Sequence, residues 1–325
     1  MIFNGVRTLI IAEAGVNHNG SEKLALELVN IAADAGADIV KFQTFKAKNI
    51  VTRRAWQANY QIENSQKKES QLDMLSRLEL SEDTYRKLVW NCNEKGIEFL
   101  STAFDVECLE FLVNDLGVKR LKIPSGEITN APLVLAHART GRDIILSTGM
   151  ASLSEIESAL GVIAYGYAFE SENPGIENFN RAYYSEAGQR ALKEKVSILH
   201  CTTEYPAPMV DINLKAMDSM AAAFRLPVGY SDHSEGIAIP IAAVARGAQV
   251  IEKHFTLDKT MEGPDHKASL EPEELASMVR EIRNIELALG DGVKGPRPSE
   301  VLNKMVARKS LVASKSIVAG EQFSS

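Results

Sequence analysis

Short runs of β-branched and apolar residues recur eight times along the chain, and a helix-like pattern follows each run. Such runs predict strands, whereas apolar residues spaced three and four apart predict helices. Eight strand–helix units in about 290 residues match the count of a (β/α)8 barrel. The predicted strands cover residues 8–15, 37–45, 97–104, 120–127, 143–150, 196–206, 227–233 and 249–256.

An open, doubly wound α/β sheet is the alternative architecture. Such a sheet usually has fewer strands and a glycine-rich turn after its first strand. No GxGxxG pattern follows residue 15, so we favour the TIM barrel. Clear helical patterns, with polar caps at several of their ends, cover residues 21–35, 81–95, 152–164, 236–246 and 271–289.

Two long segments interrupt the alternation of strands and helices. Residues 46–80 follow a strand, and long loops at that end of a barrel often build or cover the active site. Residues 165–195 form a polar segment that precedes a strand. We therefore place this second segment on the opposite face of the barrel, away from the site.

The composition changes after residue 290, where GDGVKGPRPSE contains three Gly and two Pro. Such a stretch is typical of a linker. We predict a barrel domain over residues 1–290, a linker over 291–307, and the opening strands of a second small domain over 308–325.

Charge and cysteine content limit the partners and the setting of the protein. The net charge is −7 and the pI is about 5.5, whereas nucleic-acid-binding proteins usually carry a basic field. No apolar stretch reaches about 18 residues, so we expect no membrane span, and we expect no signal peptide. Three cysteines without a CxxC motif favour a reducing, cytoplasmic setting.

Every predicted strand contains apolar residues and carries at least one polar or charged residue toward its C-terminal end. Because the C-terminal ends of barrel strands converge, these side chains are expected to share one pocket. One such residue alone is more often structural, but eight strand ends together favour a functional site. The strand ends supply Glu13, Lys41, Gln43, Thr102, Lys122, Ser125, Glu127, Ser147, residues 202–205, Ser231, Asp232, His233, Lys253 and His254.

Three lysines at these ends, Lys41, Lys122 and Lys253, indicate an anionic ligand such as a phosphate or a carboxylate. An alternative is an internal salt-bridge network with Glu13 and Glu127 and no ligand. A second alternative is a Schiff-base lysine of an aldolase, for which Lys122 is the best candidate. The accompanying hydroxyl groups belong to Thr102, Ser125, Ser147 and Ser231.

Two histidines, His233 and His254, end neighbouring strands. Together with Glu13 or Asp232, they suit a divalent cation such as Mn, Zn or Co. Two protein ligands leave open positions for water and substrate, as catalysis requires.

The remaining histidines and the strand cysteine have simpler interpretations. His18 follows the first strand within reach of the pocket, whereas His137 lies on a helix and is predicted at the surface. His200 lies within a strand and is interpreted as structural. No His/Asn arrangement points at Cys201, which favours a buried strand cysteine over a nucleophile.

Nine short motifs follow one another along the chain: AEAGVNHNG at 12–20, IVKFQTF at 39–45, STAF at 101–104, KIPSGE at 122–127, LSTGM at 146–150, LHCTTEYPAP at 199–208, GYSDHS at 229–234, EKHFT at 252–256 and GPDHKAS at 263–269. In this order they resemble the sialic acid synthase family, over about residues 8–325. Its members are transferases that condense phosphoenolpyruvate with an N-acetylated mannosamine-type hexose, giving a nonulosonic acid and phosphate. The resemblance implies an N-acetylneuraminate synthase acting on N-acetylmannosamine, or alternatively a legionaminic acid synthase acting on a 2,4-diacetamido-2,4,6-trideoxy hexose.

The resemblance also implies roles for individual residues. His233 and His254 would hold the metal, usually manganese in this family, and Glu127 would lie near the reacting carbons. The phosphate and carboxylate of phosphoenolpyruvate would be bound by Lys41, Thr102, Lys122, Ser125, Ser147 and Ser231. The sugar and the metal-bound water would be faced by Glu13, Gln43, Tyr205 and Asp265.

One residue of the substrate site departs from the family pattern. Thr203 stands where sialic acid synthases proper often have Asn, which leaves the identity of the sugar open. Family chains usually continue into a C-terminal antifreeze-like (SAF) domain, and residues 308–325 match the beginning of that domain. In the family, two chains share their sites, so the resemblance also implies a homodimer. Two rival functions stay open. One is a deoxy-sugar-phosphate synthase, and the other is a non-enzymatic barrel that only binds a sugar acid.

Overall fold

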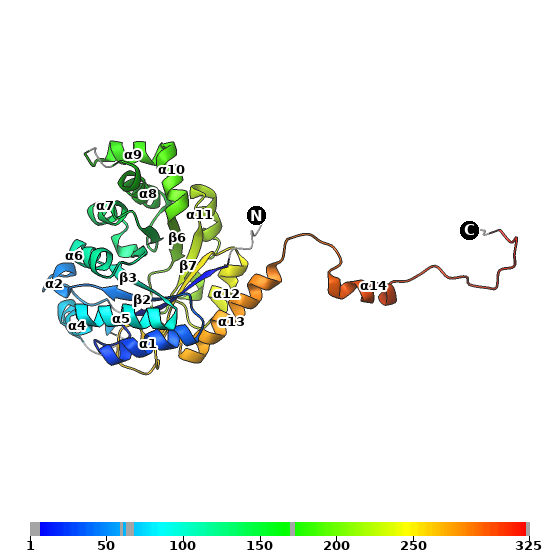
Figure 1. Cartoon of the computed structure of the whole chain (residues 1–325), viewed down its shortest axis with the longest axis horizontal. Helices are drawn as coiled ribbons and strands as arrows, with labels where there is room; N and C mark the ends of the chain where they lie inside the picture. Colours follow the sequence, from blue (N-terminus) through cyan, green and yellow to red (C-terminus); the bar gives the residue numbers. More distant parts are fainter. Residues whose placement is uncertain (1–6, 59–60, 63–67, 170–172, 323–325) are drawn as a thin grey trace. The chain divides into compact units, whose positions relative to one another are not determined.

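The computed structural model describes residues 7–58, 61–62, 68–169 and 173–322. The chain divides into a barrel unit, Phe3–Leu289, and a second unit from Gly290 onward. The barrel is a closed ring of parallel strands in sequence order, with β1 hydrogen-bonded to both β2 and β8 (Figure 1). This confirms the predicted (β/α)8 fold. The strands are β1 (Leu9–Gly15), β2 (Ile39–Thr44), β3 (Glu98–Ala103), β4 (Arg120–Ile123), β5 (Asp143–Ser147), β6 (Val196–Cys201), β7 (Val228–Asp232) and β8 (Val250–His254).

Helices surround the strands on the outside of the barrel (Figure 1). The larger ones are α1 (Glu22–Asp34), α5 (Glu82–Lys95), α7 (Ala131–Arg139), α8 (Leu153–Ala168), α11 (Ala216–Phe224), α12 (Ala238–Ala245) and α13 (Pro272–Leu289). Shorter elements are α2 (Ala47–Ile50), α4 (Gln71–Leu78), α6 (Val106–Glu110), a π-helical turn (Phe111–Asp115) and the 3-10 turns η2 (Ser125–Glu127), η3 (Met209–Asp211) and η4 (His266–Ala268).

Several helices begin where the sequence supplies a serine cap. The side chains of Ser21, Ser81 and Ser152 each accept a hydrogen bond from a backbone N–H of the first helical turn. Ser152 and Glu155 form a reciprocal capping box. Gly96 ends α5 in the left-handed conformation, with φ of 71°. These local signals fix the helix boundaries that carry the chain back to each next strand.

The strand period of two residues builds two layers inside the barrel. The lower layer takes one buried apolar residue from each of six strands, and the residue two positions later on the strand is polar in five of them. On β6 that residue is Cys201. Ile39 and Lys41 on β2 show the relationship, as do Ile145 and Ser147 on β5. The lower layer consists of Ile11, Ile39, Leu100, Ile145, Leu199 and Val250. The polar residues of the barrel mouth therefore stand directly above a dry plug.

Described residues of the first long segment lie at the C-terminal side of the barrel, as predicted. Met74 and Leu78 of α4 pack with Val16 and Phe45, the residues that directly follow β1 and β2. This small apolar cluster is separate from the main core between strands and helices. It fastens α4 beside the barrel mouth.

The described residues of the second long segment are largely helical. Its described residues extend α8 and then form α9 (Ile176–Tyr184) and α10 (Glu186–Lys195), which gather beside α8 in Figure 1. The reason lies in α8, which is apolar nearly all round and includes the fully buried Tyr165. A helix of this kind needs cover on its outer side as well as toward the barrel, and α9 supplies Phe179 against Tyr165.

His137 corrects a second prediction. It was expected at the surface, but its side chain is fully buried on α7 and its Nδ1 contacts the carbonyl of Leu133 at 2.8 Å. The helix turns this residue away from solvent, so His137 belongs to the core.

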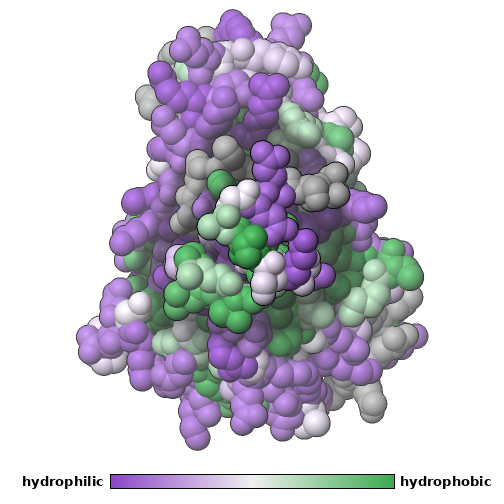
Figure 2. Space-filling model, turned by 90° about the vertical axis from the view of Figure 1, so that its right-hand side faces the viewer, coloured by the Kyte–Doolittle hydropathy of each residue, from purple (hydrophilic) through white to green (hydrophobic). Residues whose placement is uncertain are grey.

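The unit from Gly290 onward contains a 3-10 turn, Pro298–Glu300, and the short helix α14, Val301–Ala307. Its apolar side chains, among them Leu302 and Val306, are exposed within the described residues. The assignment of residues 308–325 to the beginning of a SAF domain stays a prediction. On the face drawn in Figure 2, hydrophilic side chains predominate and hydrophobic ones gather in smaller areas between them. None of the described helices is both long and apolar enough to span a bilayer.

Candidate active site

A cavity of about 270 Å³ opens at the C-terminal ends of the strands. This is where a (β/α)8 barrel usually carries its active site. Side chains of α4 line one side of it, and polar side chains from most of the strand ends line the rest. The predicted site residues that it brings together are Glu13, Lys41, Gln43, Thr102, Lys122, Ser125, Ser147, Thr203, Tyr205, Ser231, His233, His254 and Asp265.

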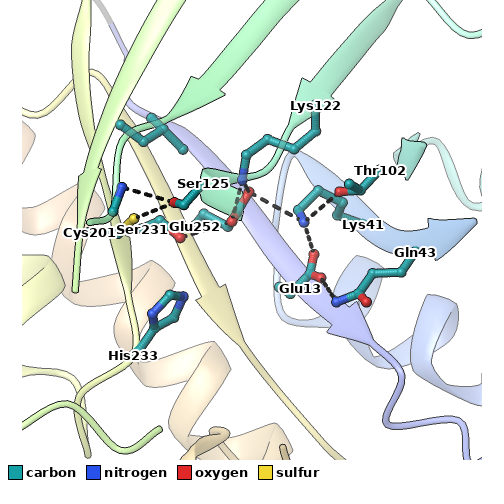
Figure 3. Close-up of polar contacts among 12 residues, drawn as sticks. Glu13, Lys41, Gln43, Thr102, Lys122, Ser125, Cys201, Ser231, His233 and Glu252 are labelled. Carbon is teal, nitrogen blue, oxygen red and sulfur yellow. Dashed lines mark hydrogen bonds and ion pairs between the residues drawn. The ribbon is translucent and has the colours of Figure 1, made fainter. Parts of the chain in front are cut away.

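A network of buried charges forms the floor of the cavity (Figure 3). Lys122 Nζ lies 2.7 and 2.8 Å from the two carboxylate oxygens of Glu252. Lys41 Nζ lies 2.6 Å from Glu13 Oε2 and 3.6 Å from Glu252 Oε2. The hydroxyl of Ser231 donates to Glu252 at 2.9 Å. Two cations and two carboxylates thus share one water-poor space above the apolar plug.

The pKa values of these groups reflect burial opposed by pairing. Burial raises the pKa of Glu13 to about 7, against the lowering effect of Lys41. Burial alone would also raise the pKa of Glu252, but Lys122 and Lys41 bring it well below its usual range. Burial lowers the pKa of Lys122, with Glu252 acting against that change. Glu252 is therefore the firmly ionised carboxylate, and Glu13 is the one able to exchange a proton near neutral pH.

Hydroxyl groups gather on the β4–β5 side of the cavity. Ser125 Oγ accepts the backbone N–H of Gly149 at 2.9 Å and contacts Cys201 Sγ at 3.2 Å. Ser147 Oγ is buried and has no hydrogen-bond partner among the described residues. A Cβ atom at Gly149 would lie 2.3 Å from Thr203 Oγ1, so only glycine lets this loop approach the site so closely.

The two predicted imidazoles lie together at the β7–β8 side. The ring centroids of His233 and His254 are 5.6 Å apart, and Tyr205 stacks on His233 at 4.1 Å. His233 Nδ1 contacts the carbonyl of Thr202 at 2.6 Å, which assigns the proton to Nδ1 and leaves a lone pair on Nε2. His254 Nδ1 is buried without a hydrogen-bond partner in the described residues, 3.9 Å from Asp265 Oδ2.

Burial lowers the pKa of both imidazoles, of His233 to about 4 and of His254 well below its ordinary value. Both are therefore neutral at physiological pH, the state in which imidazole binds a metal. Burial also raises the pKa of Asp265 to about 6. No cluster of three or more His, Cys, Asp or Glu side chains suited to a metal occurs in the part of the chain that the structure describes.

Lys253 corrects the prediction of three anion-binding lysines. Its side chain is fully buried outside the cavity, where Nζ pairs with Asp232 Oδ2 at 2.7 Å. Asp232 is therefore committed to Lys253 and does not join the histidines as a metal ligand. The cause is the alternation of β8, which turns Glu252 and His254 inward and Lys253 outward. Glu252, absent from the predicted site, takes the central position instead.

Glu127 and His18 also lie elsewhere than expected. The strand ends before Pro124, and η2 carries Glu127 to a position outside the cavity lining, where its carboxylate accepts from Asn130 at 2.7 Å. His18 is fully buried beneath the loop after β1, where its Nδ1 accepts the N–H of Gly20 at 3.0 Å. Neither side chain is among the groups that face the cavity.

A family model described as the NeuB family matches residues 28–294. The chain belongs to this family, the sialic acid synthases. Its sequence is 52% identical to the N,N′-diacetyllegionaminic acid synthase of Campylobacter jejuni, over 98% of this chain and 88% of that protein. The corresponding synthase of Legionella pneumophila is 46% identical, over 97% and 82%.

A solved structure gives the same assignment to the NeuB family. The N-acetylneuraminic acid synthetase of Leptospira borgpetersenii, crystallised with citrate, superposes with a TM-score of 0.75 at 35% identity. The match covers 95% of this chain and 94% of that one. This NeuB chain and the Leptospira synthetase therefore share the barrel over nearly their whole length.

Proposed function

We propose that this sialic acid synthase-type transferase condenses phosphoenolpyruvate with a 2,4-diacetamido-2,4,6-trideoxy hexose, giving N,N′-diacetyllegionaminic acid and phosphate. The observation that carries the reaction is the juxtaposition of two buried lysines with two neutral imidazoles in one cavity. The choice of sugar rests on the 52% and 46% identities to diacetyllegionaminic acid synthases, against 35% for the Leptospira N-acetylneuraminic acid synthetase.

The anionic substrate suits the lysine side of the cavity. Lys41 and Lys122 provide the cations, and Ser147 provides a buried hydroxyl that has no partner in the described residues. Each charge-assisted hydrogen bond contributes about 1.5–3 kcal/mol. Thr102, whose hydroxyl accepts from Lys41 at 3.4 Å, and Ser125 extend the same wall. We assign the phosphate and carboxylate of phosphoenolpyruvate to this wall.

A divalent metal, manganese by family resemblance, is proposed for the imidazole side. The donor set fits: His233 presents a free Nε2 lone pair, and His254 has a buried nitrogen without a partner among the described residues. When bound there, the metal would act as a Lewis acid toward the sugar aldehyde. Asp265, 3.9 Å from His254, supplies a carboxylate at the same edge.

The remaining steps depend on the residues of the floor. Lys41 and Lys122 orient phosphoenolpyruvate so that its C3 attacks the aldehyde carbon, whose oxygen takes up a proton and becomes a hydroxyl. Water then adds at C2, and the bond between C2 and the phosphate oxygen breaks as C2 becomes a ketone, so that the two lysines stabilise the phosphate that leaves. Glu13, with its pKa near 7, accepts the proton of that water. Glu127 has no part in this scheme because its carboxylate lies outside the cavity lining.

The sugar side of the cavity contains both polar and apolar contacts. Gln43 and Tyr205 offer polar atoms, whereas Met74, Leu75 and Leu78 of α4 form an apolar wall. A 6-deoxy sugar carries a methyl group where other hexoses carry a hydroxyl, and an apolar wall favours that methyl group. An apolar lining of this kind supports the trideoxy sugar over N-acetylmannosamine.

A homodimer and a cytoplasmic location are also proposed. Shared sites in the family support the dimer, and the three free, buried cysteines, Cys92, Cys108 and Cys201, are compatible with a reducing compartment.

Phosphate release from phosphoenolpyruvate tests the proposal when it is measured with a panel of acceptor sugars. The diacetamido-trideoxy hexose is expected to give the highest kcat/KM, with N-acetylmannosamine slower and phosphorylated aldoses inactive. Manganese is expected to restore turnover after EDTA treatment. A preference for N-acetylmannosamine would overturn the choice of sugar, and full turnover in the stripped protein would overturn the metal.

The Schiff-base aldolase predicts a different outcome at Lys122. An imine requires a free neutral amine, but both oxygens of Glu252 bind this one. Borohydride reduction in the presence of pyruvate should therefore leave Lys122 unlabelled, as peptide mass spectrometry can show. Labelling of Lys122 would favour the aldolase.

A further inference from the structure

A buried ion pair lies directly behind the two imidazoles. Asp232 and Lys253 are partners in the register of β7 and β8. Their side chains are both 0% exposed, and Lys253 Nζ lies 2.7 Å from Asp232 Oδ2. Neither residue lines the cavity. Each one precedes a histidine of the site in the sequence, since His233 follows Asp232 and His254 follows Lys253.

The pair also fixes the backbone on the far side of His233. Asp232 Oδ1 accepts both the N–H of Ser234 at 3.0 Å and its hydroxyl at 2.8 Å. Lys253 Nζ donates to the carbonyl of Ser234. His233 is thus the middle residue of a turn that is tied at both ends to one ammonium group, and that ammonium belongs to the residue next to His254.

Contacts from the loop after β6 also hold His233. The carbonyl of Thr202 binds its ring at Nδ1, and its own carbonyl accepts the N–H of Ala207 at 2.9 Å. These contacts orient the ring but do not involve β8. The strands that carry the two imidazoles are joined by their backbone ladder and by the hydrogen bond from Ser231 to Glu252. The Asp232–Lys253 pair adds a buried charged link beside the histidines themselves.

We propose that Asp232 and Lys253 are positioning residues that set the separation and orientation of His233 and His254 as a metal-binding pair. A buried ion pair is often no more stabilising than an apolar pair of the same size, so general stability does not account for it. Groups behind metal ligands typically change metal affinity 10- to 100-fold when they are removed. The metal-binding role rests on the proposed function, whereas the effect of the ion pair on the position of the two imidazoles does not.

The principal test measures manganese affinity in the full chain that carries Lys253→Met. Manganese is titrated in the absence of substrates, and the EPR signal of the free ion gives the unbound concentration. Manganese is expected to bind at least about tenfold more weakly than in the wild type. The matched control is Arg283→Met, which breaks contacts with Asp38 and the Thr8 carbonyl at the opposite end of the barrel. This control is expected to lower the melting temperature and to leave manganese affinity within about twofold of the wild type.

A second variant covers the case in which Lys253→Met does not fold. Asp232→Asn keeps the shape of the side chain and an acceptor for Ser234, but it removes the charge that binds Lys253. In metal-free crystals, this variant is expected to show the imidazole centroids displaced from their 5.6 Å separation. Imidazoles that stay in place, or unchanged manganese affinity in the variants that fold, would overturn the proposal. If the wild-type chain bound no manganese, the proposed metal would be wrong. The crystals of Asp232→Asn would still test whether the ion pair positions the two imidazoles.

Discussion

Glu252 at the end of β8 binds the ammonium of Lys122, from β4 on the opposite side of the barrel, with both of its carboxylate oxygens. The amine is therefore held in place before any substrate arrives, and its charge is already matched. An anion that enters the cavity meets two lysines whose attraction is partly offset by Glu252 and Glu13.

Glu252→Gln is expected to lower the free energy of unfolding but to increase the affinity of the cavity for phosphate. Loss of one partner of a buried pair typically costs about 3–5 kcal/mol, while the freed lysines attract an anion more strongly. A phosphate titration followed by melting temperature should show a larger rise for the variant than for the wild type. Glu98→Gln, which breaks the pair with Arg120 away from the cavity, is the control. Equal phosphate responses in Glu252→Gln and the wild type would contradict the prediction.

Lys122→Met is expected to raise the KM for phosphoenolpyruvate about 10- to 100-fold, which corresponds to the loss of one charge-assisted contact. Steady-state phosphate release at saturating sugar measures the change. Lys122→Arg keeps the positive charge and should retain part of the affinity. If KM were unchanged in Lys122→Met, Lys122 would serve Glu252 alone and the anion would bind elsewhere.

Gly149→Ala is expected to reduce kcat/KM about 10- to 100-fold, because its new Cβ would overlap Thr203 Oγ1 and crowd Ser125 Oγ. Adding Thr203→Ala should restore part of the activity by removing the nearest atom. Gly175→Ala is the matched control, since a Cβ there meets no atom within 4 Å. Full activity in Gly149→Ala would show that this loop tolerates displacement.

Asp265→Asn is expected to stabilise the metal-free protein at neutral pH. The pKa of Asp265 is raised by burial from 3.8 to about 6, so the folded state binds its proton more tightly than the unfolded state. The protonated Asp265 therefore contributes its full stabilisation to the folded wild type below pH 3.8, and this contribution is lost as the pH rises through 6. Relative to the wild type, the variant should therefore gain up to about 3 kcal/mol between these limits.

Denaturant unfolding in EDTA at intervals from pH 4.5 to 8 measures this gain. Asp143→Asn, at the exposed first position of β5, is the matched control for the same replacement. A difference between Asp265→Asn and the wild type that stayed constant across this range would contradict the assigned pKa.

The barrel and most of its site follow from two periodicities in the sequence. The strand–helix repeat predicted the fold, and the rule that strand ends converge gathered residues as distant as Glu13 and His254. The same strand period also contains a signal for Glu252. Val250, Glu252 and His254 share one face of β8, and Lys253 must lie on the other. Applied strictly, the alternation assigns Glu252 to the site and removes Lys253.

Other features depend on contacts that no local pattern reveals. The position of Glu127 follows from a 3-10 turn that replaces the end of the expected strand. The burial of His137 depends on which neighbour covers α7. The need for α9 and α10 is visible only indirectly, in the apolar outer side of α8. Tertiary packing decides such cases, and one chain's periodicity does not.

The apolar plug beneath the charged floor has a consequence for traffic through the enzyme. Ile11, Leu100 and Leu199 help to seal the barrel from below, so molecules enter and leave by the mouth alone. The ligand seated on the lysines must then arrive before the one that lies above it, and it must depart after that one has gone. On the proposed assignment of phosphoenolpyruvate to the lysines, a dead-end passage of this kind predicts an ordered kinetic sequence in which this substrate binds before the sugar.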